Sequence, residues 1–273
     1  MPHKPELGQN FLVDAQAVAR IVAGLGDLAG RTVVEIGPGR GAITGALAAR
    51  AGRVLAIELD RQLAERLRTR FDAERVTVLE QDVLKFDFAA AAAEAGERLR
   101  VAGNLPYYIT SPILLRLAAS HAALDFAVLM VQREVAERVT AAPGTRDYGL
   151  LSATVELYGP AEQLFTLPPS AFSPPPKVHS TVLRWRFAGR FAELQVDEKG
   201  FLHFLRQAFA QKRKTLSNNL RAAGIAPAVA AAALESAGIG AKARAEALPL
   251  EKLAALWRAL DLHRETARNG SDL

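Results

Sequence analysis

Short runs of branched apolar residues alternate along the chain with longer segments of helical periodicity. Apolar runs that are bounded by Gly, Pro, Asp or Asn are typical of strands buried in the middle of a sheet. They predict seven strands, at residues 32–36, 54–57, 76–79, 101–102, 125–131, 163–167 and 181–187. Strands that alternate with helices in this way indicate an α/β fold with a Rossmann-like, seven-stranded sheet.

A different pattern follows the last predicted strand. From residue 200 to about residue 262 the chain is rich in alanine and helical in its periodicity, with turn signals at single glycines and prolines. We therefore predict two domains, a sheet domain over residues 1–190 and a small all-helical domain over residues 191–273. The polar segment from about residue 264 is predicted to be a disordered tail.

A glycine-rich segment, residues 37–41, lies between the first predicted strand and a predicted helix at 42–50. Glycines let the backbone approach a ligand closely, and the N-terminus of a helix favours an anionic group. The spacing fits the G-x-G-x-x-G/A fingerprint of dinucleotide-binding proteins. With Glu35 it also fits the E-x-G-x-G-x-G pattern of methyltransferases, and a tight turn without a ligand is a third alternative.

Polar side chains follow the next three predicted strands. Glu58 ends the second strand, Asp82 follows the third and Asn104 follows the fourth. Because ligands of open α/β sheets bind at the carboxyl ends of the strands, we expect these groups to meet one ligand. Glu58 suits a bidentate grip on two ribose hydroxyls, since Asp60 is expected to cap the next helix. Asp82 suits an adenine amino group or, alternatively, an Asx turn.

The segment Asn104-Leu105-Pro106-Tyr107 predicts a site for a planar amine. The side-chain oxygen of Asn104 can accept a hydrogen bond from an amino group, and Tyr107 can stack on a flat base. Pro106 stiffens the turn, so nearby backbone carbonyls can face the same ligand. The alternative is a plain turn before the next helix.

For each of two further segments, the sequence allows two interpretations. Residues 168–178 form a loop with five prolines, and Phe172 lies within it. Phe172 is a candidate for stacking on a base from the side opposite Tyr107, or for packing in the core. Residues 8–12 are a candidate lid over a ligand, or an ordinary lead-in to the helix that Asp14 caps.

Composition and charge limit the chemistry, the compartment and the kind of partner that we expect for the chain. The chain has 273 residues, no cysteine and a net charge of +5, so disulfide and thiolate chemistry are excluded. We find no signal peptide and no apolar run of membrane length, and we expect a cytoplasmic protein. Residues 163–234 contain ten Lys/Arg and three Asp/Glu, which favours a polyanionic partner over a merely solvated basic face. We predict phosphate contacts for Lys212, Arg213 and Lys214.

Together these segments resemble the small-subunit ribosomal RNA adenine-N6,N6 dimethyltransferase family, the RsmA/KsgA type. The resemblance extends from residue 8 to about residue 262. It rests on residues 8–12, 35–39, 58, 81–82, 104–108, 172–178 and 211–215. Arg40 departs from the pattern, because a neutral residue is expected in the glycine turn. The segment before residue 8 is also short, which puts in doubt any RNA contact that longer relatives make there.

The resemblance implies a class I methyltransferase sheet, S-adenosyl-L-methionine as cofactor, and an enzyme. It implies dimethylation of the N6 amino groups of two adjacent adenosines in the 3′-terminal hairpin of 16S ribosomal RNA, coupled to small-subunit assembly. We expect a monomer that binds the small ribosomal subunit, without a membrane or a metal. The implied cofactor residues are Asn10, Leu12, Gly37, Glu58, Asp82 and Asn104. The implied catalytic residues are Asn104 and Tyr107, with Tyr107 and Phe172 on the base and Lys212, Arg213 and Lys214 on the RNA.

Three alternatives remain at this point. One is an adenine-N6 methyltransferase of the antibiotic-resistance type, which acts on 23S ribosomal RNA. A second is a DNA amino-methyltransferase, and a third is an assembly factor whose RNA binding matters more than methylation.

Overall fold

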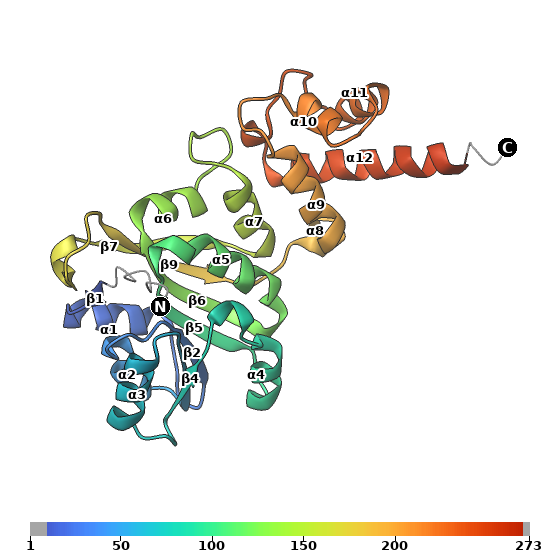
Figure 1. Ribbon diagram of the computed structural model, residues 1–273. Helices are drawn as coiled ribbons and strands as arrows, with labels where there is room; N and C mark the ends of the chain where they lie inside the picture. The colour runs from blue at the N-terminus through green and yellow to red at the C-terminus, as the bar shows by residue number, and fades with distance from the viewer. Residues whose placement is uncertain (1–9, 270–273) are drawn as a thin grey trace, which may run out of the picture. The chain divides into compact units, whose positions relative to one another are not determined.

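The computed structural model describes residues 10–269, which form two compact units (Figure 1). The first unit holds the described residues up to Ala136 together with Pro160–Ala188, and the second holds Glu137–Gly159 and the described residues from Gly189 on. The sequence predicts residues 137–159 in the sheet domain, whereas in the structure they pack with the C-terminal helices.

The first unit contains a seven-stranded sheet in the order β4-β3-β2-β5-β6-β9-β7. Its strands are β2 (Thr32–Ile36), β3 (Arg53–Glu58), β4 (Val76–Glu80), β5 (Leu99–Asn104), β6 (Leu124–Gln132), β7 (Ala161–Leu167) and β9 (Ser180–Arg186). The strands from β4 to β6 pair in parallel, and β9 pairs antiparallel with both β6 and β7. All seven predicted strands are present, and the α/β class is confirmed.

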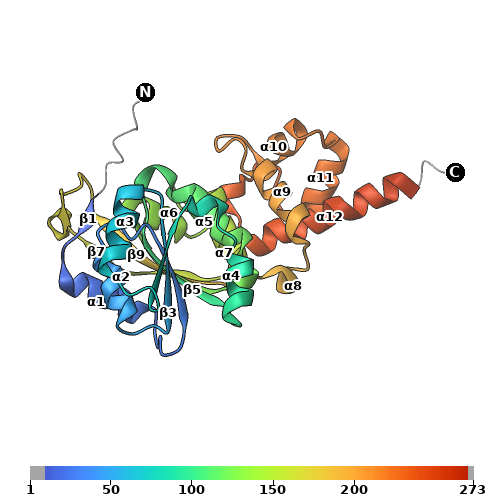
Figure 2. The ribbon, with the colours of Figure 1, turned by 60° about the horizontal axis from the view of Figure 1, so that its bottom comes forward.

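Helices cover both faces of this sheet, as its near-continuous apolar strands require. The helices α1 (Ala15–Gly24), α2 (Ala42–Ala48) and α3 (Arg61–Arg70) lie on one side, and α4 (Phe88–Ala95) and α5 (Thr110–Ala119) lie on the other (Figure 2). Asp14 and Asp60 cap α1 and α3 as predicted, because each carboxylate accepts two backbone N–H groups of the first turn. A further helix, α6 (Arg133–Val139), follows β6.

A two-stranded ribbon outside the main sheet joins segments that are far apart in the sequence. The strand β1 (Phe11–Leu12) pairs antiparallel with β8 (Phe172–Ser173), and the backbone N–H of Val13 donates to the carbonyl of Ala171 at 2.9 Å. Leu12 and Phe172 are both buried in the core cluster on the α1 side of the sheet. The ribbon therefore anchors the N-terminal segment to the proline-rich loop.

The second unit is helical. Its helices are α7 (Leu150–Tyr158), α8 (Phe191–Leu194), α9 (Glu198–Ala208), α10 (Leu216–Ala222), α11 (Pro227–Ser236) and α12 (Leu250–Asn269). The last helix continues beyond residue 264, where the sequence predicts a disordered tail, because the segment 250–269 contains neither glycine nor proline. None of the described helices has both the length and the apolar character needed to span a membrane.

Ion pairs around Arg190 explain why residues 137–159 belong to the second unit. The Arg190 guanidinium lies 2.9 Å from a Glu156 carboxylate oxygen and 2.6 Å from oxygens of both Glu193 and Glu251. Tyr158 on the same segment donates a hydrogen bond of 2.7 Å to Glu198. These contacts tie α7 to helices that follow it by many residues.

Replacing Arg190 with methionine should destabilise the protein by about 2 kcal/mol, because three carboxylates would then face one another without their cation. Arg184→Met is the matched control, since Arg184 forms a single, more exposed pair with Glu162 and should cost less than about 1 kcal/mol. Urea denaturation followed by far-UV circular dichroism measures both. Equal effects of the two substitutions would contradict the role given to Arg190.

Candidate active site

The turn between β2 and α2 has a backbone that only glycine adopts readily. Gly37, Gly39 and Gly41 have φ values of 66°, 57° and 79°, in the left-handed region that disfavours a side chain. A Cβ atom on Gly39 would also lie only 3.1 Å from the ring of Phe11. The glycine turn and β1 therefore pack directly against each other.

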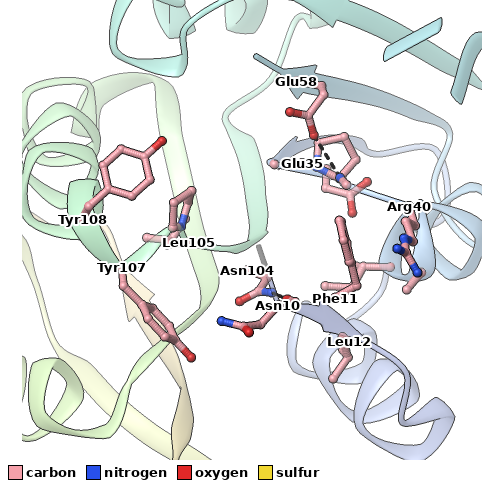
Figure 3. A pocket seen from close by; sticks show the side chains of 16 residues that line it. Asn10, Phe11, Leu12, Glu35, Arg40, Glu58, Asn104, Leu105, Tyr107 and Tyr108 are labelled. Carbon is pink, nitrogen blue, oxygen red and sulfur yellow. Dashed lines mark hydrogen bonds between the residues drawn. The ribbon is translucent and has the colours of Figure 1, made fainter. Parts of the chain in front are cut away.

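A cavity of about 330 Å³ opens at the carboxyl ends of β2, β3 and β5 (Figure 3). It is lined by 16 residues. They are Asn10, Phe11, Leu12, Glu35, Gly37, Pro38, Gly39, Arg40, Ala42, Ile43, Glu58, Asn104, Leu105, Pro106, Tyr107 and Tyr108. The cavity thus brings together six of the predicted site residues, those numbered 10, 12, 37, 58, 104 and 107. Gln9 and Gly8, which the sequence assigns to a lid, lie outside the described residues.

Glu58 holds the glycine turn to the end of β3. Its side chain is buried, one carboxylate oxygen accepts the N–H of Gly39 at 3.0 Å, and the other accepts the N–H of Asp60 at 2.9 Å. Each carboxylate oxygen can accept a further hydrogen bond, so Glu58 is both fixed in place and able to bind a ligand. Asp60 caps α3, as expected if Glu58 rather than Asp60 is the candidate for the ribose hydroxyls.

Asp82 lies at a second, smaller cavity of about 60 Å³ that shares Gly37, Glu58, Pro106 and Tyr108 with the first. One oxygen of Asp82 accepts the N–H of Leu84 at 2.9 Å, so the Asx turn given as an alternative is present. This turn fixes the carboxylate at the wall of the cavity, and the two roles are therefore compatible.

The orientation of the Asn104 carboxamide is set by a segment from the N-terminal part of the chain. Its Nδ2 donates to the backbone carbonyl of Asn10 at 3.0 Å, and Figure 3 shows the two residues next to each other. One of the two hydrogens on Nδ2 is thereby used by the protein, which fixes the orientation of the carboxamide and leaves Oδ1 able to accept a hydrogen bond from a ligand.

Tyr107 and Tyr108 begin the short 3₁₀ helix η2 (Tyr107–Ile109) directly after Pro106. Their rings point in different directions (Figure 3). The hydroxyl of Tyr107 lies 3.0 Å from the hydroxyl of Ser180, whereas Tyr108 is 61% exposed and lines both cavities. Sequence reasoning did not assign a role to Tyr108, although its place in the motif is a signal for one.

Arg40 lies at the rim of the larger cavity. Its guanidinium is 4.2 Å from the centre of the Phe11 ring, a cation–π distance, and its carbonyl accepts a hydrogen bond of 2.6 Å from Arg70. The charge that departs from the family pattern is therefore held against β1.

Two sets of predicted residues are not among those that line this cavity. Phe172 is only 4% exposed, packs in the core with Leu12 and is not among the residues that line the two cavities. Stacking of its ring on a base would require it to become exposed. Lys212, Arg213 and Lys214 belong to the second unit, where all three are exposed and Lys212 donates to the carbonyl of Arg146 at 2.6 Å.

Glu35 is a buried carboxyl group in the wall of the larger cavity. Its Oε2 has no hydrogen-bond partner among the described residues. Burial raises the pKa of Glu35 from 4.5 to about 7, and the neighbouring Glu58 carboxylate adds to this effect. If a ligand placed a cationic group here, Glu35 could lose its proton and form an ion pair with that group. Among residues 10–262, whose side chains the structure describes, no three His, Cys, Asp or Glu come together as they would to hold a metal ion.

The raised pKa of Glu35 predicts that stability falls as the pH rises from about 4.5 through about 7. The folded state binds the proton more tightly than the unfolded state, so the stabilisation is complete below pH 4.5 and is lost above pH 7. Glu35→Gln should remove this dependence, and its advantage over the wild type should grow across that range. Urea denaturation at several pH values measures it, with the exposed Glu74→Gln as the control; parallel curves for Glu35→Gln and the wild type would refute it.

Comparisons with known proteins agree with this geometry. A family model described as ribosomal RNA adenine dimethylase matches residues 2–261. A protein of Acidobacterium capsulatum named ribosomal RNA small subunit methyltransferase A is 62% identical over 260 residues, which are 95% of this chain and 92% of that protein. A protein of Koribacter versatilis with the same name is 53% identical over 269 residues, 94% of each chain.

Two solved structures share the fold. The crystal structure of a dimethyladenosine transferase from Plasmodium falciparum superposes with a TM-score of 0.76 at 24% identity, over 90% of this chain and 95% of that one. The crystal structure of the 23S rRNA methyltransferase ErmE has a TM-score of 0.70 at 26% identity, over 92% of this chain and 100% of that one. Because the family match extends over nearly the whole chain and the relatives are far above 30% identity, this chain belongs to the ribosomal RNA adenine dimethylase family.

Proposed function

We propose that this protein transfers methyl groups from S-adenosyl-L-methionine to the N6 amino groups of two adjacent adenosines in the 3′-terminal hairpin of 16S ribosomal RNA, and so acts in small-subunit assembly. The observation that carries the proposal is the carboxamide of Asn104, which is held by Asn10 at the edge of a cavity with a glycine turn and a buried Glu58. Membership of the adenine dimethylase family supports adenine as the target base.

The two cavities fit the proposed cofactor. The first backbone N–H groups of α2, which no side chain caps, would hold its carboxylate, and the unpartnered Oε2 of Glu35 would accept its ammonium group. Glu58 would accept both ribose hydroxyls, and Asp82 in the adjoining cavity would accept the adenine amino group. When bound, S-adenosyl-L-methionine supplies a methyl group on a positively charged sulfur.

Asn104 would act on the target base by accepting one N6–H in its side-chain oxygen. The second acceptor is the backbone carbonyl of Leu105 or that of Pro106. The Pro106 carbonyl already accepts the N–H of Ile109 at 3.2 Å and the hydroxyl of Thr110 at 3.0 Å, so both of its lone pairs are used. We therefore assign the second acceptor to Leu105, whose own N–H is bonded to β6 through the Met130 carbonyl at 2.9 Å.

These two hydrogen bonds favour a more pyramidal N6 atom, whose lone pair is then free to attack. As the bond from N6 to the methyl carbon forms, the bond from that carbon to sulfur would break, and the sulfur would leave as an uncharged thioether. N6 would then release its extra proton to water, so no strong base is required in the site. Catalysis then consists mainly of positioning and of fixed dipoles. Tyr107 would stack on the extruded adenine, a contact of about 1–3 kcal/mol per base, and extrusion costs least from an RNA loop.

Asn104→Ala should lower the rate of methylation at saturating cofactor about 100-fold or more, because the N6 atom loses a fixed acceptor. Unmodified small and large ribosomal subunits, incubated separately with radiolabelled cofactor and mapped by mass spectrometry, give the readout. Full activity of the variant would remove Asn104 from the mechanism. Label confined to the large subunit would favour the 23S type, and binding of immature subunits without methylation by the wild type would favour an assembly factor.

The basic run should contribute to the salt dependence of RNA binding. Arg213→Ala and Lys214→Ala should each flatten the slope of log affinity against log salt by about one. Lys212→Ala should have a smaller effect, because the Lys212 ammonium is partly satisfied by the carbonyl of Arg146. Filter binding at several salt concentrations tests this, with Lys252→Ala as the control outside the run; unchanged slopes would exclude the run from the interface.

A further inference from the structure

Ser180 places a buried hydroxyl group against the ring that we assign to the target base. Its side chain is 0% exposed, and its Oγ lies 3.0 Å from the phenol oxygen of Tyr107. A hydroxyl that is buried without a partner costs free energy, so the folded state keeps this pair together. Either hydroxyl can donate.

The two ends of this hydrogen bond differ in how firmly the backbone holds them. Ser180 is the first residue of β9 and pairs with Gln132 of β6 on one side and with Leu167 of β7 on the other. The carbonyl of the preceding His179 accepts the N–H of Arg133 at 3.0 Å. Tyr107, in contrast, begins a single turn of 3₁₀ helix that has no side-chain cap. The firmly held strand therefore fixes the ring that is less well held by its own backbone.

The next residue on β9 shows that this contact is specific to Ser180. Successive side chains of a strand point to opposite faces, and the hydroxyl of Thr181 lies 2.9 Å from that of Thr166 on β7. Thr181 is also fully buried. It therefore offers a matched control, a buried hydroxyl on the same strand that is bonded to a residue outside the cavity.

We propose that Ser180 is a positioning residue, whose hydroxyl fixes the Tyr107 ring in the orientation that receives the target adenine. A ring that is already ordered loses less conformational freedom when the base stacks on it. The proposal rests on the proposed function, because it takes the role of Tyr107 from there.

The first experiment measures the ring without any RNA. The chain has four tyrosines, so the full-length protein labelled with 3-fluorotyrosine gives a small ¹⁹F spectrum, in which the signal lost in Tyr107→Phe belongs to Tyr107. Ser180→Ala should shift this signal and change its line width, whereas Thr181→Val should leave it in place. An unchanged Tyr107 signal in Ser180→Ala would overturn the proposal, whatever the enzyme does to RNA.

The second experiment is a double-mutant cycle on kcat/KM for unmodified small subunits. Ser180→Ala and Tyr107→Phe should each lower kcat/KM about 3- to 10-fold. The double variant should be no more impaired than the more impaired of the two single variants, because both substitutions remove the same hydrogen bond. The dissociation constant for the cofactor should stay within 2-fold, and Thr181→Val should retain the wild-type kcat/KM.

Each other outcome counts against a defined part of the proposal. Losses that multiply in the double variant would show that the two hydroxyls act independently, and an equal loss in Thr181→Val would show a merely structural effect; both overturn the role of Ser180. If the ¹⁹F signal shifts as expected but the wild type methylates no adenine in either subunit, the proposed function has failed, and the positioning role fails with it. If methylation proceeds normally in Ser180→Ala, only the positioning role has failed.

Discussion

The hydrogen bond from Asn104 to the carbonyl of Asn10 is the contact on which the rest of the site depends. It decides which end of the carboxamide faces the cavity, and thereby whether the site offers an acceptor or a donor to an amino group. Asn10 is held in turn because the adjoining β1 pairs with β8. The acceptor that we propose at the end of β5 therefore depends on the packing of the N-terminal segment and of the proline-rich loop against the sheet.

Features that depend on contacts between distant segments are the ones that the sequence does not predict. The seven strands and the caps Asp14 and Asp60 follow from local periodicity and from side chains that bond their own backbone, so they are readable without tertiary structure. Glu58 is likewise predictable, because strand ends meet at one edge of a parallel sheet. The ribbon of β1 and β8 is not, since two strands of two residues leave no periodic pattern.

Contacts between distant segments account for the remaining differences. The association of residues 137–159 with the second unit depends on Arg190, whose three carboxylate partners have no common spacing in the sequence. The burial of Phe172 depends on Leu12, which is its partner in the ribbon. A proline-rich loop fixes the backbone around an aromatic residue, but it does not determine which way the ring points.

Glu35 and Glu58 show how two carboxyl groups of one cavity are given different tasks. Glu58 accepts two backbone N–H groups, which stabilise its charge although it is buried. Glu35 has an oxygen without such a partner among the described residues, and burial holds its pKa near 7. A carboxylate that is bonded to two backbone N–H groups, beside a carboxyl whose pKa is raised by burial, suits a ligand that carries both hydroxyl and ammonium groups. Because the raised pKa lies near neutral pH, an ammonium group beside Glu35 would shift the carboxyl toward its ionised form, and the ion pair would offset the cost of the buried charge.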